Sequence, residues 1–403
     1  SLARGTGLWS TSASLISGRE EHTATLLRDG SVLVVGGTDG RGTGLASAEI
    51  YNPSTNRWRS AGTMATTRLD HTATLLANGK VLVVGGIDAN FPSDTLASAE
   101  VYDPFSNRWS RAAPMNDSRS RHTATLLSDG RVLVVGGLSV QLRAGGLLVE
   151  RPTDAEVYDP RADRWSATAP MALYRRDQTA TRLLDGRVLV AGSQDNLTYN
   201  STEIYNPISD RWRVAAPMAS GRSGHSAVLL ATGDVLVVGG VSQGQNAPAI
   251  ELTSAEVYHP ATDHWSAVAS MSETHSSQTA TVLSDGRVLV LGATGLSRAE
   301  LYDPASNRWA LTGPSMDRYH HTATRLTDGR VLVVGGYGIE SLSSVMEYDP
   351  AGVAPRSQQP IDVRLVLAAL LLALAAGAWS IPAVNRRIKA LRPDPGAEEW
   401  INP

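Results

Sequence analysis

The side chains best suited to binding chemistry recur at matched positions along the chain. A basic residue stands three positions before a histidine or glutamine in seven places, namely Arg19, Arg68, Arg119, Arg175, Arg222, His275 and Arg318. Guanidinium groups bind carboxylates through paired, parallel hydrogen bonds. A ring of these residues would therefore form an electropositive mouth for acidic side chains or carboxylated ligands.

Seven glutamates recur downstream of these basic residues and offer a second interpretation. We expect each to lie in an Ala-Glu-Val-Tyr type of segment, at Glu49, Glu100, Glu156, Glu203, Glu256, Glu300 and Glu347. Since every repeat supplies both signs of charge, the arginines are also explained as structural partners of these carboxylates.

Five histidines in register raise the question of a metal, because imidazole is a common ligand. They are His22, His71, His122, His225 and His321, and the two remaining repeats carry Gln178 and Gln278. A metal needs ligands that converge on one point, whereas a sevenfold ring spreads them apart. The two glutamine repeats are also the two in which the second of paired glycines is replaced, by Ser193 and Ala293. This paired change predicts that the histidine and the second glycine are packing neighbours, with a structural role.

Composition excludes several other classes of function. The chain has no cysteine, which removes disulfides, thiolate metal sites and cysteine nucleophiles. Its net charge is -3, with 36 basic and 39 acidic residues, so no basic footprint indicates nucleic-acid binding. No group of convergent residues breaks the repeat in the way a catalytic site requires. We therefore predict no catalytic residue, no cofactor and no metal.

The elements that position these residues follow from the repeated text "HTATLLANGKVLVVGG", residues 71–86. It reads as two strands joined by Asn-Gly, and six of the seven repeats have Asn-Gly or Asp-Gly there, which favours a type I′ hairpin turn. A third strand carries the tyrosine, and a fourth carries a tryptophan seven positions later, at Trp58, Trp109, Trp165, Trp212, Trp265 and Trp309. The sequence therefore predicts four short strands in each repeat.

The seventh unit lacks its own tryptophan, and the missing strand is expected at the other end of the chain. Trp9 precedes His22 by the same interval that separates Trp58 from His71. Residues around Trp9 are therefore predicted to close a ring of seven units. Together with the methionines that follow each tryptophan, the aromatic residues are expected to form the core between units.

The paired glycines, the tyrosine and the spaced tryptophan resemble the kelch repeat over about residues 5–350. The resemblance implies an all-β, seven-bladed β-propeller, whose radial arrangement leaves only short sheet edges. It also implies a use for the arginines, since some kelch proteins bind acidic peptides with comparable residues. The galactose-oxidase branch of this architecture needs a Tyr-Cys cofactor, which a chain without cysteine cannot form.

Length varies mainly in the loop between strands two and three of each unit, so we place function on that face. The longest such loop, residues 138–155, carries the apolar run Leu147, Leu148 and Val149, a candidate contact for a partner protein unless it packs on a neighbouring blade. Phe91, Tyr199 and Tyr337 lie in other loops of this kind and would suit stacking on a glycan. Asp88, Asp94, Asp195 and Glu340 would support a carbohydrate-active enzyme if they converged.

The C-terminal part of the sequence predicts a membrane anchor. Residues 365–384 hold no charge, and 20 helical residues span about 30 Å, the thickness of a bilayer core. Four basic residues follow, at Arg386, Arg387, Lys389 and Arg392, which places the tail in the cytoplasm and the propeller outside it. We therefore expect a propeller over 1–350, a linker over 351–362, a transmembrane helix over 363–384 and a cytoplasmic tail over 385–403.

The function predicted from these features is non-enzymatic. We expect a single-pass, membrane-anchored propeller that binds another protein outside the cytoplasm, as an accessory or scaffolding subunit of a larger membrane complex. A cell-surface glycan-binding module and a propeller-type carbohydrate-active enzyme remain the alternatives.

Overall fold

A computed structural model describes residues 7–88, 94–143, 146–194, 199–242, 248–338 and 343–352. All of them belong to one unit, residues 1–353. The second unit, residues 354–403, lies outside the described residues, and so does the transmembrane helix predicted over 363–384. Within the described part of the chain, no helix has the length and apolar character needed to cross a bilayer.

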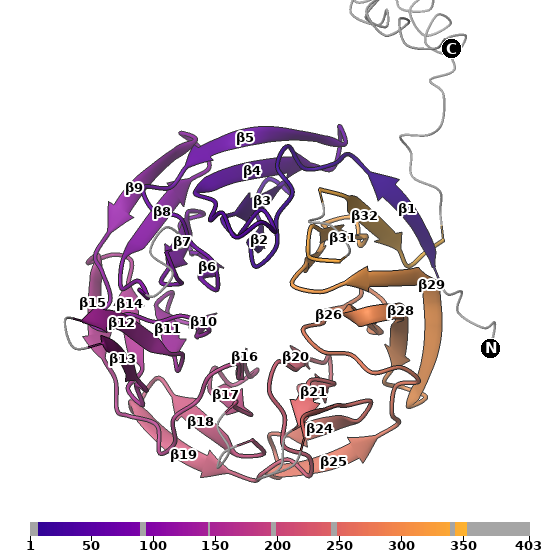
Figure 1. Ribbon diagram of the computed structural model, residues 1–403. Coiled ribbons are helices and arrows are strands. Elements are labelled where there is room, and N and C mark those ends of the chain that lie inside the picture. Colours follow the sequence, from indigo (N-terminus) through magenta and orange to yellow (C-terminus); the bar gives the residue numbers. More distant parts are fainter. Residues whose placement is uncertain are drawn as a thin grey trace, which may run out of the picture. The chain divides into compact units, whose positions relative to one another are not determined.

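The described strands form seven four-stranded antiparallel sheets arranged as blades around a central axis (Figure 1). Counted from the axis outward, blade 1 is β2 (Thr23–Leu26), β3 (Val32–Val35), β4 (Ser47–Asn52) and β5 (Arg57–Thr63). Blade 2 is β6 (Thr72–Leu75), β7 (Val81–Val84), β8 (Ala99–Asp103) and β9 (Arg108–Ala112). Blade 3 is β10 (Thr123–Leu126), β11 (Val132–Val135), β14 (Glu156–Asp159) and β15 (Arg164–Ala167). Blade 4 is β16 (Thr179–Arg182), β17 (Val188–Ala191), β18 (Thr202–Asn206) and β19 (Arg211–Ala215).

The remaining blades follow the same order. Blade 5 is β20 (Ser226–Leu229), β21 (Val235–Val238), β24 (Ala255–His259) and β25 (His264–Val268). Blade 6 is β26 (Thr279–Val282), β27 (Val288–Leu291), β28 (Ala293–Asp303) and β29 (Arg308–Arg318). Blade 7 is β30 (Thr322–Arg325), β31 (Val331–Val334), β32 (Val345–Asp349) and, outermost, β1 (Leu8–Ser12). Two short hairpins rise from loops between second and third strands, β12 (Ser139–Arg143) with β13 (Gly146–Glu150), and β22 (Val241–Ser242) with β23 (Ile250–Glu251).

The second strand of every blade is buried on both sides, which explains its uninterrupted apolar sequence. In β3, all four residues from Val32 to Val35 are fully buried. Leu33 and Val35 pack toward blade 2, while Val32 and Val34 pack toward blade 7. The core therefore consists of seven clusters, each shared by two neighbouring blades.

The tyrosine and tryptophan series lies between blades, as the sequence predicts. Tyr51 and Trp58 stand opposite each other in register, with ring centroids 5.1 Å apart. The Trp109 indole Nε1 then donates to the carbonyl of Ala61 in the preceding blade, at 2.8 Å. The same indole-to-carbonyl bond recurs at Trp58, Trp165, Trp212, Trp265 and Trp309.

The tight turn between the first two strands differs in type from the prediction. Leu27 donates to Ser31 and Gly30 donates to Leu27, which is a type I turn followed by a glycine bulge. Only Gly30, at φ 83°, takes the left-handed conformation, because the Asp29 carboxylate accepts the amide of Ser31 and holds its own residue at negative φ. The hairpin is confirmed, and the type I′ turn is wrong.

Ring closure by the N-terminal strand is confirmed. β1 pairs with β32 over five residue pairs, from Leu8 with Asp349 to Ser12 with Val345. Trp9 packs on Tyr348 at 5.1 Å, as each tryptophan does on the tyrosine of its blade. Leu15 belongs to the core cluster between blades 7 and 1. Blade 7 is thus closed within its own sheet, by the non-covalent pairing of β1 from the N-terminal end with β32 from the C-terminal end.

Deletion of residues 1–15 should abolish cooperative folding at room temperature. The deletion removes a whole edge strand, Trp9 and a core leucine, and burial of one large side chain alone is worth about 3 to 5 kcal/mol against a total stability of about 5 to 15 kcal/mol. Thermal unfolding followed by circular dichroism measures the effect. Deletion of residues 1–6, which removes none of these contacts, is the control; an unchanged melting temperature for the longer deletion would contradict closure by β1.

Candidate interaction face

The predicted basic ring lies inside the blades. Side chains at all seven positions are at most 5% exposed. In blade 1, Arg19 Nη1 donates to the carbonyls of Gly36 and Ser47 at 2.8 and 3.0 Å, and Nη2 donates to Glu49 Oε1 at 2.8 Å. Burial lowers the pKa of Arg19, and the charge of Glu49 opposes that effect.

Glu49 also holds the chain that enters the blade. Its two carboxylate oxygens accept the amides of Ile16 and Ser17 at 2.8 and 3.0 Å. The same ion pair forms between Arg68 and Glu100, Arg119 and Glu156, Arg175 and Glu203, and Arg222 and Glu256, and blade 6 has His275 against Glu300. These arginines are therefore structural partners of the glutamates, as the second interpretation of the sequence predicts.

The electropositive mouth is consequently wrong. Arg19, Arg68, Arg119, Arg175, Arg222, His275 and Arg318 do not reach the surface at which a ligand would dock. Their donors serve backbone carbonyls and carboxylates of their own blades, because a buried cation requires such partners.

Blade 7 departs from this pattern, and the sequence prediction for Glu347 is wrong. Met346, opposite Val333, occupies the register of the other glutamates, and Glu347 lies one residue later, opposite Leu332. Glu347 instead accepts a hydrogen bond of 2.7 Å from the Tyr51 hydroxyl of blade 1 and pairs with Arg330. It thus contributes to the joint between the last and first blades.

Arg318 has no carboxylate partner among the described residues. Its guanidinium donates to the carbonyls of Gly335 and Ser344 and to the Ser344 hydroxyl, at 2.7 to 3.3 Å. Burial without an opposing charge lowers its pKa to about 10. Blade 7 therefore retains the cation of the repeat and lacks its anion.

The histidine series links neighbouring blades. His71 Nε2 lies 3.0 Å from the Thr23 hydroxyl of blade 1, and equivalent bonds join the other four histidines to the first strand of the preceding blade. Burial, followed by the charge of Arg68, lowers the pKa of His71 to about 3, so the ring stays neutral. In the two substituted repeats, Gln178 and Gln278 donate to backbone carbonyls at 2.8 Å.

The predicted contact between the histidine and the second glycine is confirmed. A Cβ added at Gly86 would lie 2.9 Å from the Cβ of His71, and at Gly137 it would lie 2.9 Å from that of His122. The described residues contain no group of three histidine or acidic side chains placed to hold a metal.

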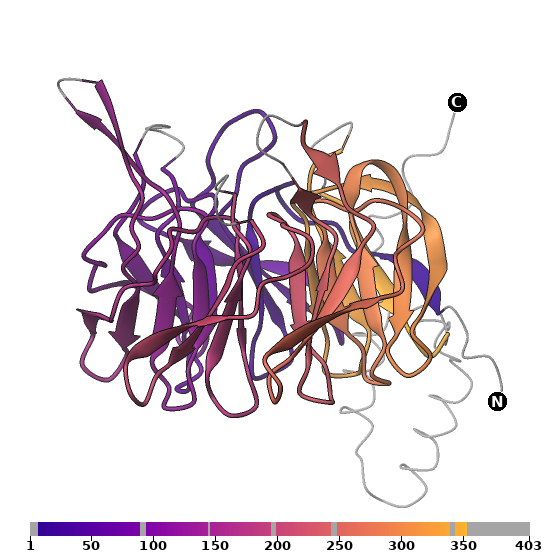
Figure 2. The same cartoon turned by 90° about the horizontal axis from the view of Figure 1, so that it is seen from below.

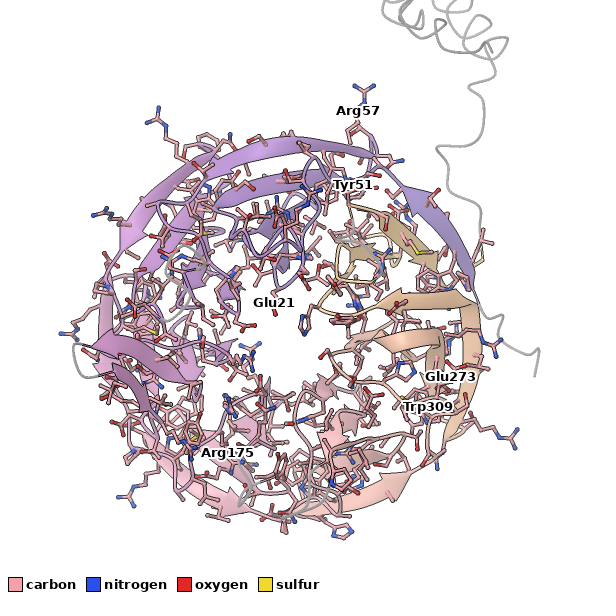
Figure 3. All side chains as sticks on the ribbon, viewed as in Figure 1. Glu21, Tyr51, Arg57, Arg175, Glu273 and Trp309 are labelled. Atoms are coloured by element: carbon pink, nitrogen blue, oxygen red, sulfur yellow. The ribbon has the colours of Figure 1, made fainter. Side chains whose placement is uncertain are left out.

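The residues that do surround the axis immediately precede this histidine or glutamine. They are Glu21, Asp70, Arg121, Asp177, Gly224, Ser277 and His320, all at positive φ. Adjacent members are joined by backbone bonds, such as the Glu21 amide to the His320 carbonyl at 3.2 Å and the Arg121 amide to the Asp70 carbonyl at 3.2 Å. Figure 3 shows Glu21 at the edge of the central opening.

The charged members of this ring, together with Glu20, form what we call the axial mouth. His320 Nδ1 lies 3.2 Å from Glu21 Oε1 and 3.7 Å from Glu20 Oε2. On the other side, Arg121 Nε lies 3.0 Å from Asp70 Oδ2. Its Nη1 lies 3.8 Å from Asp177 Oδ2. Four carboxylates thus stand around one guanidinium and one imidazole, with Arg176 near Asp177.

Protonation of the axial mouth follows from burial and crowding. Burial, reinforced by the charge of Glu21, raises the pKa of Asp70, and burial also raises the pKa values of Asp177 and Glu20. The hydrogen bond to Glu21 raises the pKa of His320. These shifts reduce the negative charge of the mouth, but its four carboxylates still outnumber Arg121 and His320, which is the opposite of the sign expected from the arginines.

Sequence reasoning missed the axial mouth, although the signal is present. The two residues between the ring arginine and the ring histidine or glutamine differ from repeat to repeat, whereas the arginine and the histidine on either side are nearly constant. Positions that vary within a repeated scaffold are where a specific surface is made.

The longest variable loop folds as the hairpin β12–β13, which Figure 2 shows rising above the ring. Leu148 is 40% exposed and Val149 is 47% exposed. Leu147 lies in β13, but its side chain is outside the described residues. Leu148 and Val149 therefore face solvent, whereas the base of the same hairpin contacts the neighbouring blade, where the Thr95 amide donates to the Val140 carbonyl at 2.9 Å.

The two described aromatic residues proposed for glycan stacking, Tyr199 and Tyr337, are each packed within their own part of the propeller. Tyr199 is 8% exposed, and Tyr337 packs on Tyr319 with centroids 5.2 Å apart. Phe91 lies outside the described residues, as do the acidic residues Asp195 and Glu340. Asp88 accepts a hydrogen bond from the Thr67 hydroxyl.

The chain belongs to the kelch-repeat family. The family described as "KLHDC2/KLHL20/DRC7 Kelch-repeats domain" matches residues 21–240, and "Kelch motif" matches residues 221–272. Propellers of this family are typical protein-protein interaction modules.

Three curated relatives show how far the similarity extends. Kelch-like protein 25 of Xenopus tropicalis is 29% identical over 27% of this chain and 17% of its own length. Kelch repeat-containing protein kel-10 of Caenorhabditis elegans is 36% identical over 24% of this chain and 16% of its own length. Kelch-like protein 36 of Mus musculus is 25% identical over 55% of this chain and 28% of its own length. The chain thus spans less than a third of the length of these relatives.

Two solved structures share the propeller fold. One, titled a fungal alcohol oxidase of the AA5 family in complex with copper, aligns with a TM-score of 0.70 at 20% identity, over 87% of this chain and 79% of that one. The other, titled "Structure of YjhT", aligns with a TM-score of 0.58 at 13% identity, over 74% of this chain and 99% of that one. At these identities the likeness concerns the fold.

Replacement of Glu21 by Gln should lower the pKa of His320, because the charged partner of the imidazolium is removed. The raised pKa means that this pair stabilises the protein below about pH 6.5, the ordinary value, and that the contribution is lost as pH rises through the folded-state pKa. Titration of the His320 ring by NMR measures the shift. Glu273→Gln, distant from the mouth, is the control; an unchanged His320 pKa in Glu21→Gln would contradict the pairing.

Proposed function

We propose that this propeller is a non-enzymatic interaction module that binds a protein partner on the face of its variable loops. The observation that carries the proposal is the hairpin β12–β13, which presents Leu148 and Val149 to solvent at 40% and 47% exposure. Exposed apolar side chains on a projecting hairpin fit an interface core, where a partner excludes water from them.

The axial mouth supplies the polar part of the same face. Its four carboxylates outnumber its cations, so it favours a partner that presents arginine or lysine side chains. Such complementarity raises the rate of association and selects among partners more than it adds affinity. The partner expected here therefore combines an apolar contact with a basic segment, and an acidic peptide is disfavoured.

We further propose that the propeller is anchored in a membrane and faces away from the cytoplasm. Support comes from the charge-free residues 365–384 and from the basic residues that follow them. A small interaction module held at a membrane is suited to the role of an accessory or scaffolding subunit in a membrane complex.

Gentle detergent extraction, followed by sizing and mass spectrometry, tests the interaction. We expect a stoichiometric membrane protein to migrate with the chain and to be lost when both Leu148 and Val149 are changed to Ser. Leu184→Ser is the matched control, since Leu184 is 74% exposed in a turn on the opposite face. Migration of the chain alone, or equal loss in the control, would contradict a partner on the variable face.

Protease protection tests the membrane arrangement. In intact cells, an external protease should cut the propeller loops and spare an epitope fused after residue 403, because positive charges retain the tail in the cytoplasm. Digestion of the epitope with the propeller spared would refute this topology.

A further inference from the structure

The outer rim of the propeller is positively charged, although the net charge of the whole chain is -3. In blades 1 to 6, the first four positions of the outermost strands hold eight arginines and His264, and no acidic residue. Charges on exposed edge strands prevent sheets from pairing with other chains, and either sign would serve that purpose. Edge protection alone therefore does not explain a uniform positive sign.

The positive charge is densest where blades 1 and 2 meet. Arg57 and Arg59 on β5 and Arg108 and Arg111 on β9 are all exposed, and these two strands are neighbours on the rim. Figure 3 shows Arg57 pointing outward. We call these four residues the rim patch.

Few acidic groups neutralise the rim patch. In blades 1 and 2 the turn before the outer strand ends in Asn56 and Asn107, whereas in blades 3, 4 and 5 it ends in Asp163, Asp210 and Asp263. Asp163 is the acidic group that reaches blade 2, where it accepts the amide of Ala113 at 2.9 Å. The adjacent Asp103 is engaged by Lys80 at 3.2 Å and by the amide of Phe105 at 3.0 Å. Arg59 donates to Asn107 at 3.1 Å, a contact that leaves its charge unopposed.

An apolar side chain projects beside these arginines. Phe105, in the turn that leads into β9, is 100% exposed. Ile208, at the equivalent turn of blade 4, is 93% exposed, so two separate tips project from the same side of the ring. A side chain of this kind on a convex turn would be removed from water if it inserted into an apposed surface.

We propose that the rim patch and Phe105 dock the propeller against an anionic lipid bilayer. Arginines attract a negatively charged headgroup layer, and an aromatic side chain enters the boundary between headgroups and acyl chains. A bilayer accepts projecting tips at unrelated spacings, such as Phe105 and Ile208, whereas a protein partner would need a matching pocket for each. This surface differs from the variable-loop face and does not depend on the function proposed for that face.

The test uses the propeller alone, residues 1–353, so that residues 365–384 do not contribute to binding. This fragment is the compact unit that contains every described strand, including the β1–β32 pairing that closes the ring, and circular dichroism checks that it is folded. Sedimentation with vesicles of phosphatidylcholine that also contain phosphatidylserine should show binding that weakens with salt. Vesicles of phosphatidylcholine alone should show little binding.

Replacement of Arg57 and Arg108 together by Gln should lower the partition coefficient roughly thirtyfold, since each arginine near an anionic surface contributes about a fivefold factor. Phe105→Ser should also lower it, without changing its dependence on salt. The control removes two exposed arginines elsewhere, by Arg41→Gln and Arg298→Gln, and should change binding less than about twofold. Circular dichroism confirms that each variant is folded.

Three outcomes would overturn the proposal. They are absence of binding to the anionic vesicles, an equal loss in the control variant, and binding to a soluble polyanion such as heparin without binding to vesicles. In the last case the rim patch would serve a different class of partner.

Discussion

The fold depends on a buried basic residue in each repeat that forms hydrogen bonds with two neighbouring blades. The side chain of Arg68 bonds to Gly85, Ser98 and Glu100 of blade 2, while its backbone carbonyl accepts the amide of Gly37 in blade 1 at 2.8 Å. The same backbone bond recurs around the ring, and Arg19 accepts the amide of Gly336 across the closure. A buried ion pair adds little net stability over apolar packing, but loss of one partner is costly. The ion pair matters here because it fixes the position at which the chain enters each blade.

The consequence for function is that the repeated cations are unavailable to ligands. Once the guanidinium groups are inside, the surface takes its charge from positions that the scaffold leaves free. The position two residues after each buried arginine, held at positive φ, makes the axial mouth acidic, with Glu21, Asp70 and Asp177 in three of the blades. The outer strands make the rim basic through Arg57 and its equivalents. One repeat thus builds two surfaces of opposite sign from a nearly neutral chain.

Most of the fold could be predicted from spacing, because spacing determines strands, blades and closure. The sequence interval between Trp9 and His22, equal to that between Trp58 and His71, was enough to predict that β1 pairs with β32. What spacing does not determine is whether a long side chain turns inward. The sequence allows Arg19 either a ligand-binding or a structural role, and its hydrogen bonds to Glu49 and to the carbonyls of Gly36 and Ser47 decide for the structural one. Likewise, the count of residues between the strands did not distinguish the type I turn with its glycine bulge from the type I′ turn that was predicted.

Blade 7 shows how a small departure from the repeat carries structural information. Its glutamate is displaced by one residue, and in a strand one residue turns the side chain to the other face of the sheet. Glu347 thereby leaves Arg318 and faces blade 1, where it meets Tyr51 and Arg330. At all seven joints the chain continues from the outer strand of one blade to the inner strand of the next, and here it runs from β1 through residues 13–22 to β2. The non-covalent closure lies inside blade 7, where β1 from the N-terminal end pairs with β32 from the C-terminal end. Glu347 lies on β32, the strand that pairs with β1, so its hydrogen bond with Tyr51 and its ion pair with Arg330 add contacts beside that closure.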